Sequence, residues 1–211
     1  MSTELLNCIM WTGAGFLSGS LMFAYWGGWL FLNKDIRDYG TGNPGAVSAW
    51  KAGGWKIGVP TGILDLAKGL VPVGLAIWSF GVSGWYLVPV ALAPILGHAF
   101  TPFLKFKGGR ATAVTLGVWT AITVWEGMLV LGIIIGLIYA VIENSAWANI
   151  LGMLGFLAYL LVVGIFIRGL ELSILAIWAG NTGVMVIKHW HGFFEPVKPR
   201  SYVVRLFRKA S

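Results

Sequence analysis

The chain has 211 residues, of which 57% are hydrophobic and only 11% are charged, whereas a soluble domain carries roughly a quarter charged residues. This excludes an ordinary soluble domain, and the length indicates one domain, 1–211. In a soluble protein the net charge of +7 would suggest nucleic acid. Here the cations flank apolar runs, so we expect membrane topology to explain them and expect no nucleic-acid partner. The single cysteine, Cys8, excludes an internal disulfide.

Seven apolar segments follow one another along the chain, with lengths near the roughly 20 residues that cross a bilayer. They are continuous runs without the alternation of barrel strands, so helices are the expected form. We predict an all-α, polytopic membrane bundle with about seven transmembrane helices. One alternative is that 111–142 forms a single long helix with a buried Glu126. The segments are 5–32, 57–80, 84–100, 111–125, 127–142, 147–167 and 170–187.

The basic residues predict the orientation. All of the 15 lysines and arginines except Lys68 and Arg168 lie in three regions: loop 33–56, loop 101–110 and the tail 188–211. Seven spans place all three regions on one face, which the positive-inside tendency makes cytoplasmic. We therefore expect the N-terminus outside and the basic tail inside. The last basic residues of this tail are Arg208 and Lys209.

The stretch DIRDYGTGNPGA, residues 35–46, has the composition of an anion-binding loop. Its glycines can take positive φ and expose backbone N–H groups. Arg37 can bind phosphate or carboxylate through two hydrogen bonds, and Thr41 and Asn43 add polar partners. The alternative is an ordinary turn-rich loop. The glycines are Gly40, Gly42 and Gly45.

The stretch FLKFKGGRATAVTLGV, 103–118, places cations and bare backbone at the start of an apolar helix. Gly108 and Gly109 come immediately before that helix, and a helix N-terminus attracts phosphate. The alternative is a positive-inside flank, which explains the charges but not the paired glycines. The cations are Lys105, Lys107 and Arg110.

Other ionisable residues are further candidates. Asp65 and Lys68 lie within the second segment, three residues apart, so they can pair on one helix face. Such residues mark either a functional site or a structural ion pair. His98 ends the third segment. His189 and His191 lack a third ligand cluster, so we expect no metal site.

Together these stretches resemble the bacterial acyl-phosphate:glycerol-3-phosphate acyltransferases, the PlsY family. DIRDYGTGNPGA resembles the first motif, with Thr41 in place of its serine. LDLAKG, 64–69, and GHAFTPFLKFKGGRATAVTLGV, 97–118, resemble a further family stretch and the second motif, with Arg110 in place of lysine and Ala111 in place of glycine. KHWHGF, 188–193, is similar to the start of the third motif, in which Gly192 replaces an asparagine.

The resemblance implies an inner-membrane enzyme of phospholipid biosynthesis whose active site faces the cytoplasm. It implies acyl transfer from acyl-phosphate to the 1-hydroxyl of glycerol-3-phosphate, giving lysophosphatidic acid. Membrane lipids are further partners, and no cofactor is implied. Phosphate is a good leaving group, so fixed cations suffice to stabilise it and the oxyanion. The alternative is a non-enzymatic paralogue that binds or transports a phosphorylated metabolite or lipid.

The resemblance also selects the site residues. The catalytic candidates are His189, Arg37 and Thr41, with His189 as general base unless the substrate's own phosphate serves. If this selection holds, the two glycine loops, Lys68 and His189 converge in one pocket. The candidates for binding substrate phosphates are Arg37, Gly40, Thr41, Gly42, Asn43, Lys68, His98, Lys105, Lys107, Gly108, Gly109 and Arg110.

Overall fold

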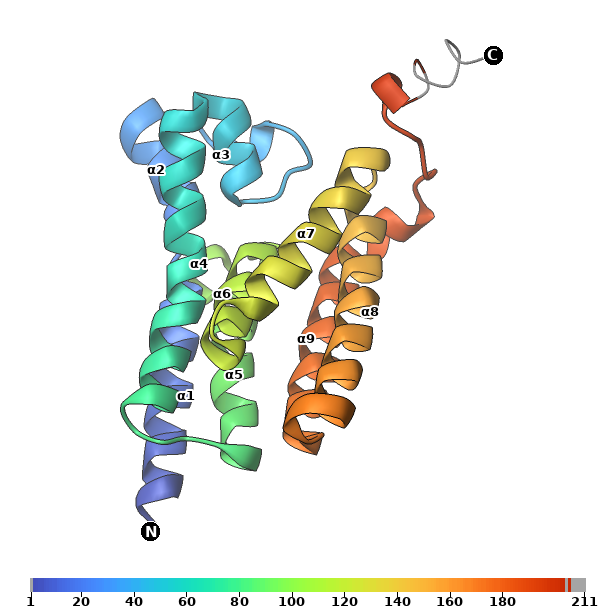
Figure 1. The fold of residues 1–211 in the computed structure, drawn as a ribbon. Helices are drawn as coiled ribbons and strands as arrows, with labels where there is room; N and C mark the ends of the chain where they lie inside the picture. Colours follow the sequence, from blue (N-terminus) through green and yellow to red (C-terminus); the bar gives the residue numbers. More distant parts are fainter. Residues whose placement is uncertain (1, 204, 206–211) are drawn as a thin grey trace.

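The computed structural model describes residues 2–203 and 205, so the tail cations Arg208 and Lys209 lie outside the described residues. Over the described residues the chain is all-helical without a β-strand, as predicted (Figure 1). The α-helices are α1 (Thr3–Ser20), α2 (Phe23–Leu32), α3 (Ala46–Gly53), α4 (Trp55–Trp78), α5 (Gly84–Ala99), α6 (Thr112–Thr123), α7 (Glu126–Val141), α8 (Ser145–Val163) and α9 (Leu172–His189).

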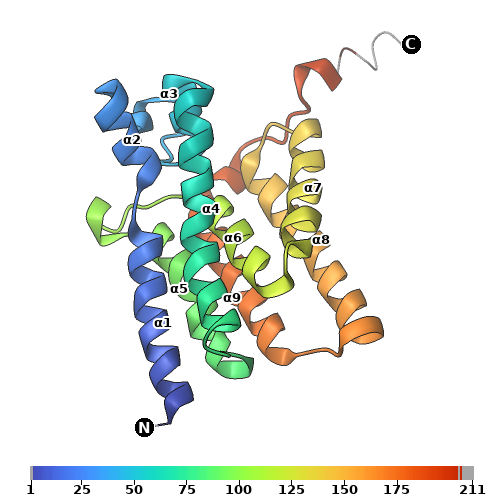
Figure 2. The same cartoon turned by 60° about the vertical axis from the view of Figure 1, so that its left-hand side comes forward.

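The helices run up and down one bundle. In the part of the chain that the structure describes, four helical stretches are long and apolar enough to cross a membrane, and α6 and α7 are shorter apolar helices. The four stretches are Thr3–Leu32, Trp55–Trp78, Gly84–Leu104 and Ser145–Arg168. Figures 1 and 2 place the N-terminus and the α4–α5 and α8–α9 connections at one end. The α2–α3 region, the α7–α8 connection and residues 190–203 lie at the other.

The first apolar segment does not form the single helix that its hydropathy predicts. The backbone leaves helical geometry at Leu21 (ψ 123°) and Met22 (ψ 66°), which separates α1 from α2. A residue remote in sequence stabilises this break between α1 and α2. The buried Lys68 Nζ donates to the freed Leu21 carbonyl at 2.5 Å. The helix α3 was not predicted either, and it lies within what the sequence indicates as loop 33–56.

The segments 111–125 and 127–142 form two helices, and the alternative of one long helix is wrong. Val124 and Trp125 take left-handed φ values of 51° and 76°, which end α6 and reverse the chain into α7. Glu126 is exposed, not buried, and pairs with Arg168 at 2.6 Å.

Close helix contacts explain many of the glycines. A Cβ on Gly69 or Gly117 would meet the backbone of the facing helix, so α4 and α6 pack against one another through bare backbone. Beside this contact the core contains the fully buried Trp119, whose ring lies 4.8 Å from that of Phe156 between centroids. The indole N–H donates to Asn181 Oδ1 at 3.0 Å, so the polar atom buried in the core is satisfied.

Candidate functional site

A cavity of about 440 Å³ lies between the glycine loop, the start of α6 and parts of α3, α4, α5, α7, α8 and α9. Its wall combines backbone of the 40–46 loop with polar side chains from distant parts of the chain. Among the predicted site residues, those that line it are Gly40, Thr41, Asn43, His98, Arg110 and His189.

The two predicted loops are joined directly. The Arg110 backbone N–H donates to Asn43 Oδ1 at 3.0 Å, across 67 positions of sequence. Gly40 and Gly42 take the positive φ predicted for them, 80° and 71°, and these values shape the first loop. Asn43 therefore fixes the loop 35–46 against the entry of α6.

Gly108 and Gly109 lie behind the cavity wall and pack against His98. A Cβ on Gly108 would overlap the His98 carbonyl oxygen, and one on Gly109 would overlap His98 Nε2. The Gly109 N–H donates to that same carbonyl at 3.0 Å. The paired glycines thus let the loop lie directly on His98, and neither lines the cavity.

Arg110 is held by a polar network at the start of α8. Its Nη1 donates to Ser145 Oγ at 2.7 Å, and the Ser145 carbonyl accepts from Asn149 Nδ2 at 2.7 Å. Asn149 Oδ1 accepts from the Thr112 hydroxyl at 3.0 Å. Burial lowers the pKa of the Arg110 guanidinium, but arginine stays charged in proteins. Arg110 is therefore a fixed, partly desolvated cation in the cavity wall.

His189 lies opposite this network at the end of α9. Its Nδ1 is 2.9 Å from the Met185 carbonyl oxygen, which only accepts, so Nδ1 carries the proton. Its Nε2 faces Asn149 Nδ2 at 3.4 Å. A neutral imidazole with an accepting Nε2 fits both contacts. The ring is buried and lines the cavity.

Two buried polar atoms lack an aligned hydrogen bond among the described residues, Asp65 Oδ1 and His98 Nδ1. Asp65 Oδ1 lies 2.9 Å from Lys68 Nζ, an ion-pair distance, yet has no aligned hydrogen bond. His98 Nδ1 has no hydrogen-bond partner among the described residues. Both side chains line the cavity, whereas Lys68 points to Leu21 and does not. Buried polar atoms are rarely left unsatisfied, so His98 Nδ1 indicates where a ligand group would bond, whereas Asp65 Oδ1 is already paired with Lys68.

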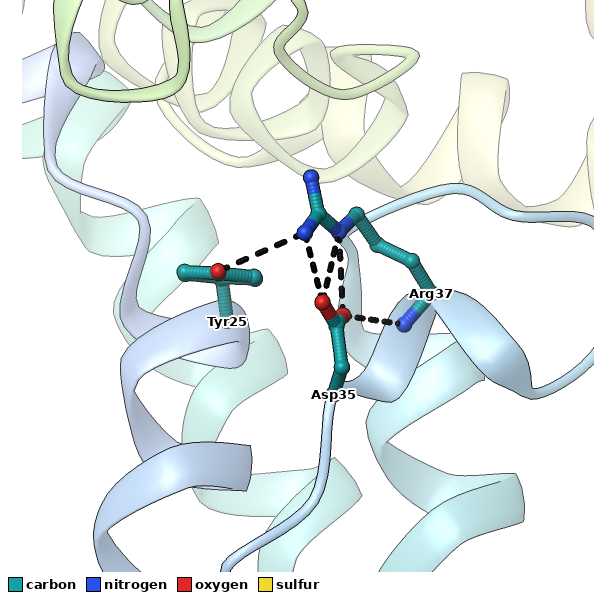
Figure 3. Close-up of polar contacts among 3 residues, drawn as sticks. All are labelled: Tyr25, Asp35 and Arg37. Atoms are coloured by element: carbon teal, nitrogen blue, oxygen red, sulfur yellow. Dashed lines mark hydrogen bonds and ion pairs between the residues drawn. The ribbon is translucent and has the colours of Figure 1, made fainter.

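Arg37 is bound by the neighbouring carboxylate of Asp35 (Figure 3). Its Nη2 lies 2.5 Å from Asp35 Oδ2, its Nε 3.0 Å from both carboxylate oxygens, and its guanidinium 4.9 Å from the centre of the Tyr25 ring. The hydrogen bond from Arg37 lowers the pKa of the Asp35 carboxyl, and the same contact raises the pKa of Arg37. Arg37 is 42% exposed and does not line the cavity.

Some predicted site residues do not line the cavity, and some lining residues were not predicted. Lys105 and Lys107 are exposed and, like Gly42, lie outside the lining. Sequence reasoning missed polar lining residues that lie on α3, α6, α7 and α8. The missed residues are Ser48, Lys51, Thr112, Tyr139, Ser145 and Asn149. The polar NSAWAN start of the otherwise apolar α8 is the signal that would have identified Ser145 and Asn149.

A helical membrane bundle whose cavity combines a fixed cation, glycine-loop backbone and hydrogen-bond donors defines a class of protein that handles an anionic, phosphate-like head group. A family profile described as "Glycerol-3-phosphate acyltransferase" matches residues 9–193. The chain therefore belongs to the glycerol-3-phosphate acyltransferase family, as the sequence motifs predict.

Individual relatives agree with this assignment. Glycerol-3-phosphate acyltransferase 1 of Thermotoga maritima is 45% identical over 122 residues, which cover 55% of this chain and 58% of that protein. The glycerol-3-phosphate acyltransferase of Leptospira borgpetersenii serovar Hardjo-bovis (strain JB197) is 42% identical over 126 residues, covering 56% of this chain and 55% of that protein. The matches thus span little more than half of these relatives' length.

Solved structures extend the similarity over the whole fold. The glycerol 3-phosphate form of PlsY (YgiH), an integral membrane glycerol 3-phosphate acyltransferase, matches with a TM-score of 0.78 and 26% identity. That match covers 98% of this chain and 100% of PlsY. The lysophosphatidic acid form of PlsY matches with a TM-score of 0.73 and 26% identity, covering 96% of this chain and 92% of PlsY. The prediction of a membrane-embedded helical bundle is confirmed.

Proposed function

We propose that the protein transfers an acyl chain from acyl-phosphate to the 1-hydroxyl of glycerol-3-phosphate and so forms lysophosphatidic acid for phospholipid biosynthesis. The observation that supports this best is the joined pair of loops, in which Asn43 accepts from the Arg110 N–H beside a cavity of about 440 Å³. Family membership supplies the reaction class.

The cationic side of the cavity is proposed to bind phosphate. Arg110, oriented by Ser145, would pair with a phosphate oxygen through a charge-assisted hydrogen bond. Lys51 adds a second cation, and the backbone at Gly40 and Thr41 adds donors. A cation fixed in this way also stabilises the tetrahedral oxyanion and the phosphate that departs.

Asp65 and His98 are proposed to bind the glycerol hydroxyls, because both side chains line the cavity and His98 Nδ1 has no hydrogen-bond partner among the described residues. During the reaction the hydroxyl oxygen forms a bond to the acyl carbon, and the bond from that carbon to the phosphate oxygen breaks. The hydroxyl proton goes to a base, for which the departing phosphate and His189 are the candidates. His189 Nε2 must first give up its contact with Asn149.

The other proposed phosphate ligands require a change of contacts. The Arg37 guanidinium would have to exchange its hydrogen bonds to Asp35 for bonds to the substrate, because Nε and Nη2 already donate to that carboxylate. Lys68 contributes to the site through its ion pair with Asp65, which does line the cavity.

The proposal includes seven spans, an N-terminus outside and a cytoplasm-facing cavity in the bacterial inner membrane. The described basic segments before α4 and after α9 lie at the end of the bundle opposite the N-terminus, which supports this orientation (Figure 1). Cysteine labelling from each side of sealed vesicles, at Ser2 and at Lys198, tests it. Labelling of both positions from one side would contradict it.

The activity is tested with purified protein in detergent, given acyl-phosphate and labelled glycerol-3-phosphate. We expect lysophosphatidic acid only when both substrates are present. Arg110→Ala should lower kcat/KM by about 10²- to 10³-fold, whereas the matched control Lys56→Ala, an exposed cation outside the cavity lining, should not.

The result also decides between enzyme and paralogue. A folded protein that binds glycerol-3-phosphate but forms no product would overturn the acyltransferase proposal. It would favour a binding or transport protein, the alternative raised by Gly192 in the third motif.

A further inference from the structure

Four neighbouring residues form an exposed tip on the loop between α5 and α6: Phe103, Lys105, Phe106 and Lys107. We call them the aromatic-lysine tip. The two aromatic rings are 55% and 65% exposed, and both lysines are exposed. Among the described residues neither lysine is in an ion pair, and neither lines the cavity.

The base of this tip is fixed to the bundle. Thr101 is fully buried, and its hydroxyl donates to the Ser20 carbonyl at 2.8 Å, at the end of α1. On the other side, Gly108 and Gly109 lie directly on His98. The tip is therefore a short segment with both ends anchored, and it holds its side chains in a defined place.

The backbone of the tip is held in an unfavourable conformation. Lys105 and Phe106 have φ values of 52° and 62°, a left-handed geometry that non-glycine residues seldom take. Hydrogen bonds from Lys105 N to the Pro102 carbonyl (3.2 Å) and from Phe106 N to the Thr101 carbonyl (2.9 Å) maintain it. Consecutive strained residues that display aromatic and cationic side chains suggest a recognition role.

The tip projects from the side of the bundle, not from its end. In Figure 2 the light-green segment after α5 extends sideways beside the top of α1, at the break between α1 and α2. Trp26 of α2 packs edge-on against Phe103, with 5.8 Å between ring centroids, and is itself partly exposed. Aromatic rings next to lysines at the flank of a membrane bundle have the chemistry of the bilayer interface.

We propose that the aromatic-lysine tip binds the head groups of anionic phospholipids. Phe103 and Phe106 would enter the boundary between head groups and acyl chains, and Lys105 and Lys107 would pair with lipid phosphates. Charge complementarity selects this partner, because residues 101–110 contain three cations and no acid and the cytoplasmic leaflet is negatively charged. The tip is continuous with Arg110, so lipid contact there would hold the cavity wall against the membrane surface from which an acylated substrate arrives.

The test measures lipid binding and not activity, so it is independent of the proposed reaction. The protein is equilibrated in bilayers of equal phosphatidylglycerol and phosphatidylcholine, and the lipids that remain bound are counted by native mass spectrometry. We expect a preference for phosphatidylglycerol that Lys105→Gln/Lys107→Gln lowers by about fivefold per lysine, and that high salt also lowers. The control Lys34→Gln/Lys56→Gln removes the same charge from two exposed lysines outside the tip, which lack its adjacent exposed phenylalanines, and should lower the preference less than the tip variant does.

Two results would overturn the proposal. Equal losses in the tip variant and the control would mean that general surface charge attracts the lipid. An unchanged lipid preference together with weaker acyl-phosphate binding would mean that these lysines contact substrate. Because all four side chains are exposed, the variants should fold, and a thermal unfolding curve checks that they do.

Discussion

Gly108 is the position at which one methyl group should disturb the site most. A Cβ there would overlap the His98 carbonyl oxygen and lie 2.9 Å from the Ala99 carbonyl oxygen. Both atoms belong to the backbone of the last turn of α5, so neither can rotate away. Gly108→Ala must therefore move the loop outward, and Arg110 with it.

The size of the effect follows from this geometry. Overpacking of a well-packed contact costs about 1–3 kcal/mol, and a backbone obstacle places Gly108→Ala near the upper value. A displacement of about 1 Å at a positioning residue lowers catalysis by about 10²-fold. Gly109→Ala should be milder, because the atoms it would meet belong to the His98 side chain.

The assay combines thermal unfolding in detergent with kcat/KM for acyl transfer. Gly183→Ala in α9 is the matched control, since its Cβ would meet nothing within 4 Å, and alanine there should stabilise the helix by up to about 1 kcal/mol. If Gly108→Ala keeps the stability and activity of this control, the loop does not lie on His98 as described and the reasoning is refuted.

Three further substitutions test single contacts. Ser145→Ala removes the acceptor of Arg110 Nη1 and should lower kcat/KM by about tenfold, with an unchanged melting temperature. Asp65→Asn leaves the partner of a buried ion pair uncompensated, so unfolding should show a loss of about 3–5 kcal/mol; no loss would contradict the pairing. Because Arg37 lowers the pKa of Asp35, their contact stabilises the fold above the unfolded-state pKa of about 3.9 and is lost as pH falls through the lower folded value. Asp35→Asn should therefore lower the free energy of unfolding by less than about 1 kcal/mol between pH 5 and 8. Below the folded-state pKa of Asp35 it should lower it by nothing, and a loss that stays constant down to about pH 2 would contradict this.

Hydropathy predicted the helices whose ends coincide with a change of polarity. The segments 57–80 and 84–100 became α4 and α5 with ends shifted by at most two residues, because glycine and polar residues close each run. The break between α1 and α2 was not predictable in this way. Apolar residues continue through it, and it is stabilised by Lys68, which lies 47 positions away in sequence.

The site was predictable where one short stretch contains all of its parts. Loop 35–46 and Arg110 were identified because glycines and polar residues interrupt apolar runs, and Asn43 and Arg110 do meet. Ser145 and Asn149 were missed because their role arises from the packing of α8 beside α6. Charge spacing could not separate Arg110 from Lys107, because the two cations lie in one basic stretch and only the fold exposes Lys107 while it turns Arg110 into the cavity wall.

The short helix α6 adds partial positive charge to the cavity, which supports the phosphate binding proposed for it. Its first residues, Thr112 and Ala113, lie in the wall, so the N–H groups that no helical turn can satisfy are at the cavity. Their partial positive charge adds to that of Arg110. Ala111, which stands in place of the glycine of the family motif, has a φ of 60° and accepts from Thr115 N at 2.8 Å. Alanine therefore adopts the left-handed geometry that favours glycine, at a cost of about 1–2 kcal/mol.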